Sequence, residues 1–429
     1  MLVQCPTGFG KTVMASSIAQ SSINKEKRAL LVVHRTELVD QSYDAFTDWR
    51  LNPGIIAAGY PGSRSAQVQI AMVQTLARRL DLFDHFDLIM VDEAHHSVAG
   101  TWDKILARYT KAVVIGLTAT PERLDGKGLG THYDDLVCGP SVRWLIDNKM
   151  LSEFRLLEPP TMKPQEFHLR AGEFIQSEVL AAVDNPVVYG DAVSHYLQYS
   201  AGERCISFCV SLGMSRKLVD AYRDRGVPAA HVDGETDKAE RKRCMQDFHE
   251  GRLLVLSNVG LFSEGVNVPN VQTVQLLAPT ASLTKYLQSV GRALRYVPGK
   301  TATILDHVGN KQRHGWPDAE REWSLEGRKK KGGGQAFLKQ CKNCYAANAL
   351  SARECSNCGE PFPVAESREI EQVDGNLIEG HREIVTTEQV QDMIKKATTM
   401  SDWHAIAKLT GRKPGWAWHQ FNNMIGRRK

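Results

Sequence analysis

The chain has 429 residues, of which 42% are hydrophobic and 24% charged, and its formal net charge is +4. This length is sufficient for two or three domains, and the composition is that of a globular protein rather than a disordered or fibrous one. The sequence contains neither a run of about 18 apolar residues nor the pattern of a signal peptide, which excludes a membrane-spanning class and predicts a protein of the cytoplasm.

The nine cysteines are expected to stay reduced or to bind metal in that compartment. The small positive charge does not by itself establish a nucleic-acid partner. Its distribution is more informative, because basic residues gather at 328–331 and again near the C-terminus.

An apolar strand at the start of the chain runs into a glycine loop, with the sequence LVQCPTGFGKT over residues 2–12. Gly8 and Gly10 allow a tight turn in which backbone N–H groups face phosphate at a helix N-terminus. Lys11 is expected to reach the β- and γ-phosphates and Thr12 to hold Mg²⁺. The alternative is an ordinary turn, but a helix-forming run follows directly at 13–19. The predicted nucleotide contacts are Thr7, Gly8, Phe9, Gly10, Lys11 and Thr12.

Apolar segments then alternate with helix-forming segments, which predicts a parallel sheet covered by helices on both faces. The predicted strands are 28–33, 55–58, 68–73, 88–91 and 112–117, and a helix is predicted to start at 34–38. Ligands of such sheets bind at the carboxyl ends of the strands.

Asp92, Glu93, Ala94 and His95 stand at such a strand end. We assign Asp92 to the Mg²⁺ shell and Glu93 to the general base that activates water. The alternative is a pair of solvated acids that the helix dipole favours at a helix start.

A second polar cluster, 116–121, follows the next predicted strand. The hydroxyls of Thr118 and Thr120 could bond the turn that contains His95 and so couple nucleotide state to a nucleic-acid surface. Taken alone, the cluster would be an ordinary threonine-rich turn.

Pro159, Pro160 and Pro164 predict an extended connector and a domain boundary at about 155–165. A second α/β pattern follows without a phosphate loop of its own. Its predicted strands are 204–210, 229–232, 253–257, 271–277 and 301–305, and its predicted helices are 212–224, 238–249 and 283–294.

Arg292 and Arg295 lie three apart in the last of these predicted helices, so both guanidiniums could point into one cleft. This spacing suits an arginine-finger arrangement that neutralises charge on a γ-phosphate. The alternative is a solvated helix face. The glycine-containing segment 257–269 is expected to border the same cleft.

Together these segments resemble the ordered motifs of a superfamily 2 helicase of the DEAD/DEAH and restriction-helicase branch. Residues 5–12 are similar to motif I, 34–38 to motif Ia, 92–95 to motif II and 118–120 to motif III, while 257–269 resemble motif V and 288–295 motif VI. The particular likeness is to RadD-type bacterial DNA-repair helicases and their phage relatives, because a cysteine module follows the core.

The resemblance implies two tandem RecA-like domains with parallel sheets that bind ATP and Mg²⁺ between them, followed by a small zinc-ribbon module and a helical tail. It adds Gln288 to the catalytic residues and Gly265 to the nucleotide contacts. The expected division is 1–158 and 159–312 for the two domains, 313–338 for a basic glycine-rich linker, 339–363 for the zinc module and 364–429 for the tail.

Three departures from the family pattern stand out. Cys5 replaces the family's Ala or Gly, a small-for-small change that we expect to be tolerated, and Asn267 replaces the usual Asp of motif V. The adenine-recognising helix and glutamine motif expected upstream of Pro6 are absent, which favours a start codon further upstream over relaxed base recognition.

Cys341, Cys344, Cys355 and Cys358 form two Cys-x-x-Cys pairs. Four thiolates at this spacing predict tetrahedral Zn²⁺, against the alternatives of surface thiols or a redox pair. Apart from Cys5, the remaining cysteines are scattered along the chain and are expected to be small buried residues. They are Cys138, Cys205, Cys209 and Cys244.

In the tail, helical spacing around Val390 and Trp403 leads to a segment, 411–419, in which basic residues alternate with tryptophans. Such a segment can touch phosphates and stack on bases. A small helical hairpin with a tryptophan core is an equal alternative.

The sequence therefore predicts an ATP-dependent helicase or translocase acting on DNA, single-stranded or branched, in repair, recombination or phage replication. RNA remains an open alternative substrate, and repair or replication proteins are possible partners, in the cytoplasm or nucleoid of a bacterial or phage-infected cell. The rival functions are a degenerate, non-catalytic DNA-binding protein and the motor subunit of a restriction complex.

Overall fold

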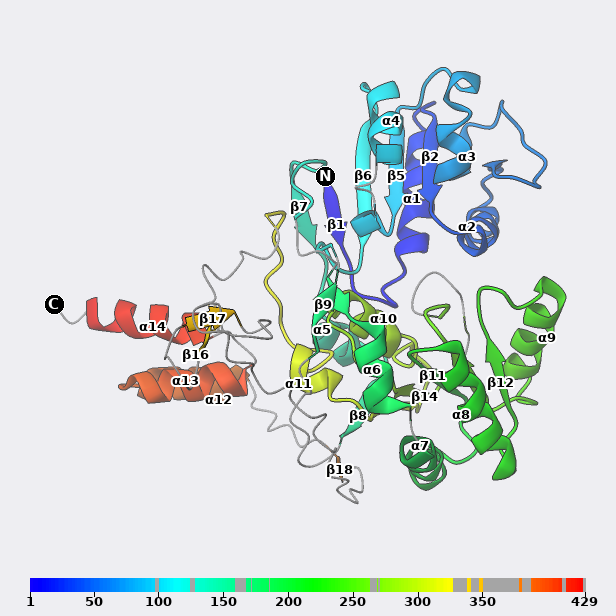
Figure 1. The fold of residues 1–429 in the computed structure, drawn as a ribbon. Helices are drawn as coiled ribbons and strands as arrows, with labels where there is room; N and C mark the ends of the chain where they lie inside the picture. Colours follow the sequence, from blue (N-terminus) through cyan, green and yellow to red (C-terminus); the bar gives the residue numbers. More distant parts are fainter. Residues whose placement is uncertain are drawn as a thin grey trace.

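The computed structural model describes residues 1–96, 100–123, 128–158, 167–170, 172–184, 186–262, 268, 271–326, 338–340, 347–349, 378–379, 387–410 and 414–426. Two seven-stranded sheets dominate it (Figure 1). Each is covered by helices on both faces, as the alternation of apolar strands and helices predicts.

The first sheet is parallel throughout, in the order β3-β4-β2-β5-β6-β1-β7. Its strands are β1 (Leu2–Gln4), β2 (Ala29–Val33), β3 (Gly54–Ile56), β4 (Val68–Met72), β5 (Leu88–Asp92), β6 (Val113–Thr118) and β7 (Leu136–Cys138). Strand β2 shows why this sheet is buried on both faces. Leu30 and Val32 enter one core cluster, while Ala29, Leu31 and Val33 enter the other.

Helices divide between these two faces. Helices α1 (Lys11–Ile23) and α2 (Thr36–Asp48) contribute to one cluster, and α3 (Val73–Ala77) and α4 (Gly100–Arg108) to the other. Two short 3₁₀ turns, η1 (Leu80–Leu82) and η2 (Ala94–His96), lie between strands and helices. The elements that carry the predicted motifs I, Ia, II and III are therefore all in this domain.

The second sheet has the order β12-β13-β11-β14-β15-β8-β18. Its parallel strands are β8 (Glu153–Glu158), β11 (Cys205–Phe208), β12 (Ala229–Val232), β13 (Val255–Asn258), β14 (Thr273–Leu276) and β15 (Thr301–Asp306). Strand β18 (Ile378–Glu379) adds to the edge in the antiparallel sense, which the sequence did not predict.

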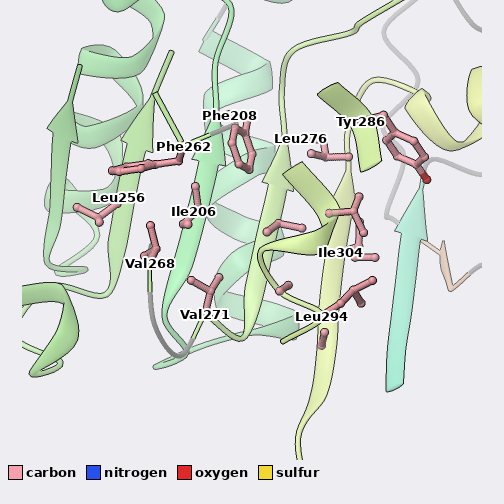
Figure 2. Close-up of a cluster of buried hydrophobic side chains, with 14 of the residues drawn as sticks. Ile206, Phe208, Leu256, Phe262, Val268, Val271, Leu276, Tyr286, Leu294 and Ile304 are labelled. Carbon is pink, nitrogen blue, oxygen red and sulfur yellow. The ribbon is translucent and has the colours of Figure 1, made fainter. Parts of the chain in front are cut away.

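Helices α5 (Val142–Asp147), α9 (Lys238–His249) and α10 (Leu283–Gly291) pack on one face of this sheet, and α6 (Gln176–Val183), α7 (Pro186–Tyr199) and α8 (Leu212–Asp224) on the other. Figure 2 shows the first of these cores, in which Phe208, Phe262 and Ile304 lie among other buried side chains. The short helix α11 (Asn310–His314) follows β15.

The change from one domain to the other comes earlier than the predicted boundary at 158. Strand β8 pairs with β15, and Leu145, Leu151 and Leu156 belong to the core of the second sheet. The crossing therefore lies between β7 and α5. The prolines that suggested the boundary, at 159–164, follow β8 and lie outside the described residues.

The start of the predicted linker 313–338 is also corrected. Trp316 packs against the core of the second domain, Asp318 is buried, and Leu325 packs against the core of the first. The backbone of Gly130 donates a hydrogen bond to the carbonyl of Leu325 at 3.0 Å. Residues 316–326 thus connect the two cores rather than forming a free spacer.

The remaining described elements are two short hairpins and three C-terminal helices. They are β9 (Leu169–Arg170) with β10 (Glu173–Phe174), β16 (Leu338–Gln340) with β17 (Ala347–Ala349), and α12 (Thr387–Lys396), α13 (Met400–Leu409) and α14 (Pro414–Gly426). Among the described residues, every helix is too short or too polar to cross a membrane.

Candidate active site

The glycine loop connects β1 to the N-terminus of α1, as predicted. Gly10 adopts the left-handed conformation at the N-cap (φ 99°), which an L-residue with a Cβ rarely adopts. The side-chain hydroxyl of Thr7 is buried in the loop without a hydrogen-bond partner. Open amides at a helix start and an unpaired buried hydroxyl together fit an anionic ligand such as phosphate.

Asp92 and Glu93 follow β5 at the carboxyl edge of the same sheet. Asp92 accepts a hydrogen bond from the backbone N–H of Glu93 at 3.0 Å, and Glu93 has a positive φ of 47°. The pKa of Asp92 is raised to about 6, mainly by burial and also by the charge of Glu93, against the opposing effect of Lys11. A partly buried carboxyl of this kind fits a cation such as Mg²⁺, because the cation offsets the cost of partly desolvating its charge.

Lys11 and Glu93 form an ion pair in which Nζ lies 3.1 Å from Oε1, with side chains only 14% and 10% exposed. The predicted phosphate lysine and the predicted general base are thus brought together, although 82 residues separate them. The Lys11 ammonium therefore lies beside the residue that follows β5, at the carboxyl edge of the sheet.

A chain of polar contacts leads away from Glu93 through the predicted coupling residues. Its Oε2 lies 3.5 Å from Nδ1 of His95, which lies 3.0 Å from Oγ1 of Thr118. The Thr118 hydroxyl donates to the carbonyl of Thr120 at 2.8 Å. The Thr118 hydroxyl therefore bonds the turn that contains His95, as the sequence predicted, whereas the Thr120 hydroxyl bonds the second domain instead. All three residues are buried.

The second domain completes this site through one face of α10. Nε2 of Gln288 lies 3.5 Å from Oε2 of Glu93, and Oγ1 of Thr284 lies 2.6 Å from Oγ1 of Thr120. Sequence reasoning found Gln288 but missed Thr284. A usable signal existed, because residues 284, 288 and 291 follow the spacing i, i+4, i+7 of one helix face.

Two close contacts seat the second domain against the glycine loop. A Cβ added to Gly291 would lie 2.6 Å from Cγ2 of Thr7, so only glycine allows this approach. Leu151 packs against the other side of the loop, where a Cβ on Gly8 would lie 2.8 Å from its Cδ2. Leu151 was not predicted as part of the site.

The predicted pair of arginines on one helix is corrected. Helix α10 ends at Gly291 rather than at 294, so Arg292 caps the helix whereas Arg295 forms an isolated antiparallel bridge with Leu151. The guanidinium of Arg295 lies 3.5 Å from the carbonyl of Val268, and burial lowers its pKa. Arg292 is buried next to the Gly291–Thr7 contact.

Some predicted residues cannot be placed. Gly265 and Asn267 lie outside the described residues, as do the four cysteines Cys341, Cys344, Cys355 and Cys358. Cys205, Cys209 and Cys244 are buried as expected, while Cys138 is exposed, contrary to the expectation for it.

Comparison with known proteins agrees with this geometry. Residues 1–123 match the family "Type III restriction enzyme, res subunit", and residues 190–297 match "Helicase conserved C-terminal domain". A 51.5 kDa protein of a Lactococcus phage is 34% identical over 91% of this chain and 83% of its own length. The chain belongs to the superfamily 2 helicases. It is therefore an ATP-hydrolysing enzyme of the nucleic-acid helicase class.

More distant relatives of the helicase extend this picture. A Saccharomyces cerevisiae protein carrying the helicase name IRC3 is 29% identical over 72% of this chain but 48% of its own length. The "DNA 3'-5' translocase XPB2" of Sulfurisphaera tokodaii is 25% identical over 72% of this chain and 77% of its own. The chain spans about half the length of the two yeast relatives.

Solved structures share the fold. A fragment described as an HsdR subunit of a type I restriction enzyme from Vibrio vulnificus aligns with a TM-score of 0.57 at 24% identity, over 74% of this chain and 62% of its own. Helicases of this superfamily use ATP and Mg²⁺. The buried Thr7 hydroxyl, the left-handed Gly10 and the partly buried Asp92 carboxyl fit both ligands.

Proposed function

We propose that this helicase couples ATP hydrolysis to movement along DNA, in repair, recombination or phage replication, as a relative of the RadD-type helicases. The observation that carries the coupling is that one site is assembled from both domains: Glu93 meets Gln288, and Thr120 meets Thr284. The printed name of the translocase relative and the phage origin of the 34% identical relative support DNA as the track and a role in phage or bacterial cells. The same origin supports action in the cytoplasm.

In this proposal ATP supplies the phosphoryl group that passes to water, and Mg²⁺ offsets the charge of its phosphates. Lys11 and the amides of the glycine loop hold phosphate, and Thr12 and Asp92 hold the metal. Glu93 orients and deprotonates water, assisted by Gln288. Arg292 is proposed as the arginine finger, without Arg295, because the end of α10 separates the two.

The proposal is tested by measuring ATPase activity with single-stranded, duplex and forked DNA and with RNA. Wild type should hydrolyse ATP faster with DNA than alone. Lys11→Ala and Glu93→Gln should each lower the stimulated rate by about 100-fold or more, because they remove phosphate binding and water activation. Lys25→Ala, an exposed lysine of the same domain, is the matched control and should leave the rate unchanged.

Equal activity in all four proteins would end the catalytic assignment. DNA binding without DNA-stimulated hydrolysis by wild type would instead favour the rival, a non-catalytic DNA-binding protein. Stimulation by RNA alone would move the substrate from DNA to RNA.

A second candidate function, the motor of a restriction complex, is favoured by the matched restriction-enzyme family and by the HsdR-like neighbour. Such a motor acts with a nuclease. The candidate is supported if the purified helicase cleaves no DNA alone but co-purifies from its native cell with a nuclease that requires its ATPase activity.

We also propose a structural zinc site formed by Cys341, Cys344, Cys355 and Cys358. Four thiolates in two Cys-x-x-Cys pairs match the ligand set that Zn²⁺ prefers. Elemental analysis should find one Zn²⁺ per chain, lost in Cys355→Ser and retained in Cys138→Ser, whose cysteine is exposed in the first domain. Metal-free wild-type protein would contradict the site.

A further inference from the structure

The three C-terminal helices form a small unit with its own apolar core. Trp403 is 5% exposed and packs with Ile406 of α13 and Ala417 of α14. The ring of Trp416 meets that of Trp403 edge-on, with centroids 5.7 Å apart and planes at 66°. Two of the tail's three tryptophans are therefore part of the helical core, as one of the two sequence interpretations expected.

The third tryptophan lies on the other side of α14. Gly415, Trp418, His419 and Asn422 are all exposed, and their spacing places them along one face of the helix. Trp418 is 55% exposed, and its ring lies edge-on to that of His419 with centroids 5.2 Å apart. Nothing lies within 4 Å of a Cβ added to Gly415, so this face is open.

The segment 411–429 carries positive charge without balancing acidic residues. Residues 411–429 contain no aspartate or glutamate, whereas Arg412 and Lys413 directly precede α14 in sequence and three basic residues, 427–429, directly follow it. The neighbouring helices differ, because Asp392 of α12 pairs with Lys396 and Asp402 of α13 accepts backbone N–H groups at 398 and 399. In the sequence, basic residues therefore flank both ends of α14.

We propose that the exposed face of α14 binds an unpaired DNA strand, with Trp418 stacking on a base and His419 and Asn422 contacting base edges. This inference rests on the proposed DNA-dependent function. An indole face is a stacking platform for any base, amide and imidazole groups donate and accept hydrogen bonds at base edges, and the flanking cations match phosphates. A fully paired duplex offers no unstacked base to Trp418, so unpaired DNA is the better fit.

The test is fluorescence anisotropy of the full chain with a labelled single-stranded oligonucleotide. Trp418→Ala should weaken binding by about 5- to 150-fold, the range for loss of one stacked base, with the salt slope unchanged because the side chain is neutral. Duplex affinity should change less. Trp49→Ala, which removes an exposed tryptophan of the first domain, is the matched control and should bind as wild type.

Thermal unfolding of Trp418→Ala checks that α14 stays folded, and His419→Ala provides an independent variant that should also weaken single-strand binding. Wild-type affinity in both variants overturns the inference, as does equal weakening on duplex. Loss of binding to polyglutamate with unchanged binding to DNA also overturns it, in favour of an acidic peptide. If wild type shows no DNA-stimulated ATPase but Trp418→Ala loses single-strand affinity, the proposed function fails and the α14 site stands.

Discussion

Glu93 is held by three independent restraints. Its backbone is left-handed, one carboxylate oxygen accepts from Lys11 at 3.1 Å, and the other faces Gln288 and His95 at 3.5 Å. A positive φ outside glycine costs about 1 kcal/mol or more and persists only where the surroundings impose it. Its presence at the residue that Lys11, Gln288 and His95 all contact supports a catalytic rather than a solvated acid.

Lys300 is a second residue whose importance only the structure reveals. Its ammonium donates to the carbonyls of Val271 at 3.2 Å, Ala293 at 2.7 Å and Arg295. It thereby holds the turn that ends α10 and presents Arg292. The pKa of Lys300 is lowered to about 8, mainly by burial and also by the charge of Arg295, while Glu203 acts in the opposite sense.

We therefore expect ATP turnover to fall as pH rises through about 8, because the neutral amine has only two N–H groups for three carbonyls. Lys300→Arg keeps the charge and should hold its activity to higher pH, whereas Lys300→Met should be low at every pH. The measurement is steady-state ATPase between about pH 6.5 and 10.

Global unfolding would not explain such a fall. The unfolded chain, with a lysine pKa near 10.4, binds this proton more tightly than the folded one, so deprotonation of Lys300 favours folding between about pH 8 and 10. The stability of wild type relative to Lys300→Met should thus rise across this window while turnover falls. A pH profile identical in wild type and Lys300→Arg would contradict the role.

Among the elements, helix α10 is the one on which the site depends most. Its N-terminal turn carries Thr284, its middle Gln288, and its end Gly291, and each contacts a different motif of the first domain. Glu173 of β10 accepts from the backbone of Ala281 at 2.7 Å and so fixes the loop that leads into the helix. A shift of α10 would therefore move all three contacts together.

Thr284→Val tests this directly, because it keeps the shape of the side chain but leaves the Thr120 hydroxyl without its partner across the domains. Loss of one buried hydrogen bond costs about 1 kcal/mol, which corresponds to about fivefold in turnover. We expect kcat for DNA-stimulated hydrolysis to fall by that factor with little change in nucleotide affinity. Thr303→Val is the matched control, since its hydroxyl accepts from Nε of Arg155 at 3.1 Å within the second sheet. A larger loss in the control would refute the interdomain role.

Sequence periodicity correctly predicted the helices whose limits depend on residues next to them in the chain. Helices α8 and α9 have the predicted limits, because Ser211 and Asp237 cap them with side-chain acceptors. Tertiary contacts set the others. The end of α10 depends on Lys300 and on Ser152, whose hydroxyl donates to the carbonyl of Arg295 at 3.0 Å. The sequence of α10 itself does not indicate that Lys300 and Ser152 contact its end.

The residues of the site likewise divide into those that local sequence indicates and those that depend on tertiary contacts. The order of the motifs predicted the phosphate loop, Asp92, Glu93 and Gln288, because each stands at a strand end or on a helix face that the chain marks locally. Leu151 and Lys300 were missed, since their roles exist only once two distant segments meet, whereas Thr284 was missed although it shares a helix face with Gln288 and Gly291. Strand β8 was hidden for the same reason, because pairing with β15 decides which domain it joins.

At the scale of the whole molecule, the two domains meet in places other than the nucleotide site. Residues 316–326 connect the two cores, and an ion pair links the domains away from Glu93. In this pair, Nη1 of Arg241 on α9 lies 2.7 Å from Oε1 of Glu37 in the first turn of α2. Arg241 also donates to the carbonyls of Asp233 and Gly234 at 2.9 and 3.1 Å, so its guanidinium is held in place on the second domain.

We expect this pair to favour the closed arrangement of the domains. A double-mutant cycle with Glu37→Gln and Arg241→Gln, measured by single-turnover ATP hydrolysis, should give a coupling energy of about 0.5–1 kcal/mol, small because both side chains are partly exposed. Raising NaCl from about 50 mM to about 500 mM should remove most of it, because screening weakens exposed charge pairs. The same cycle on Lys27 and Asp87, an ion pair within the first domain, should show no coupling in hydrolysis. If the Glu37–Arg241 coupling is absent at low salt, or equals that of the control pair, closure depends on α10 and on residues 316–326 instead.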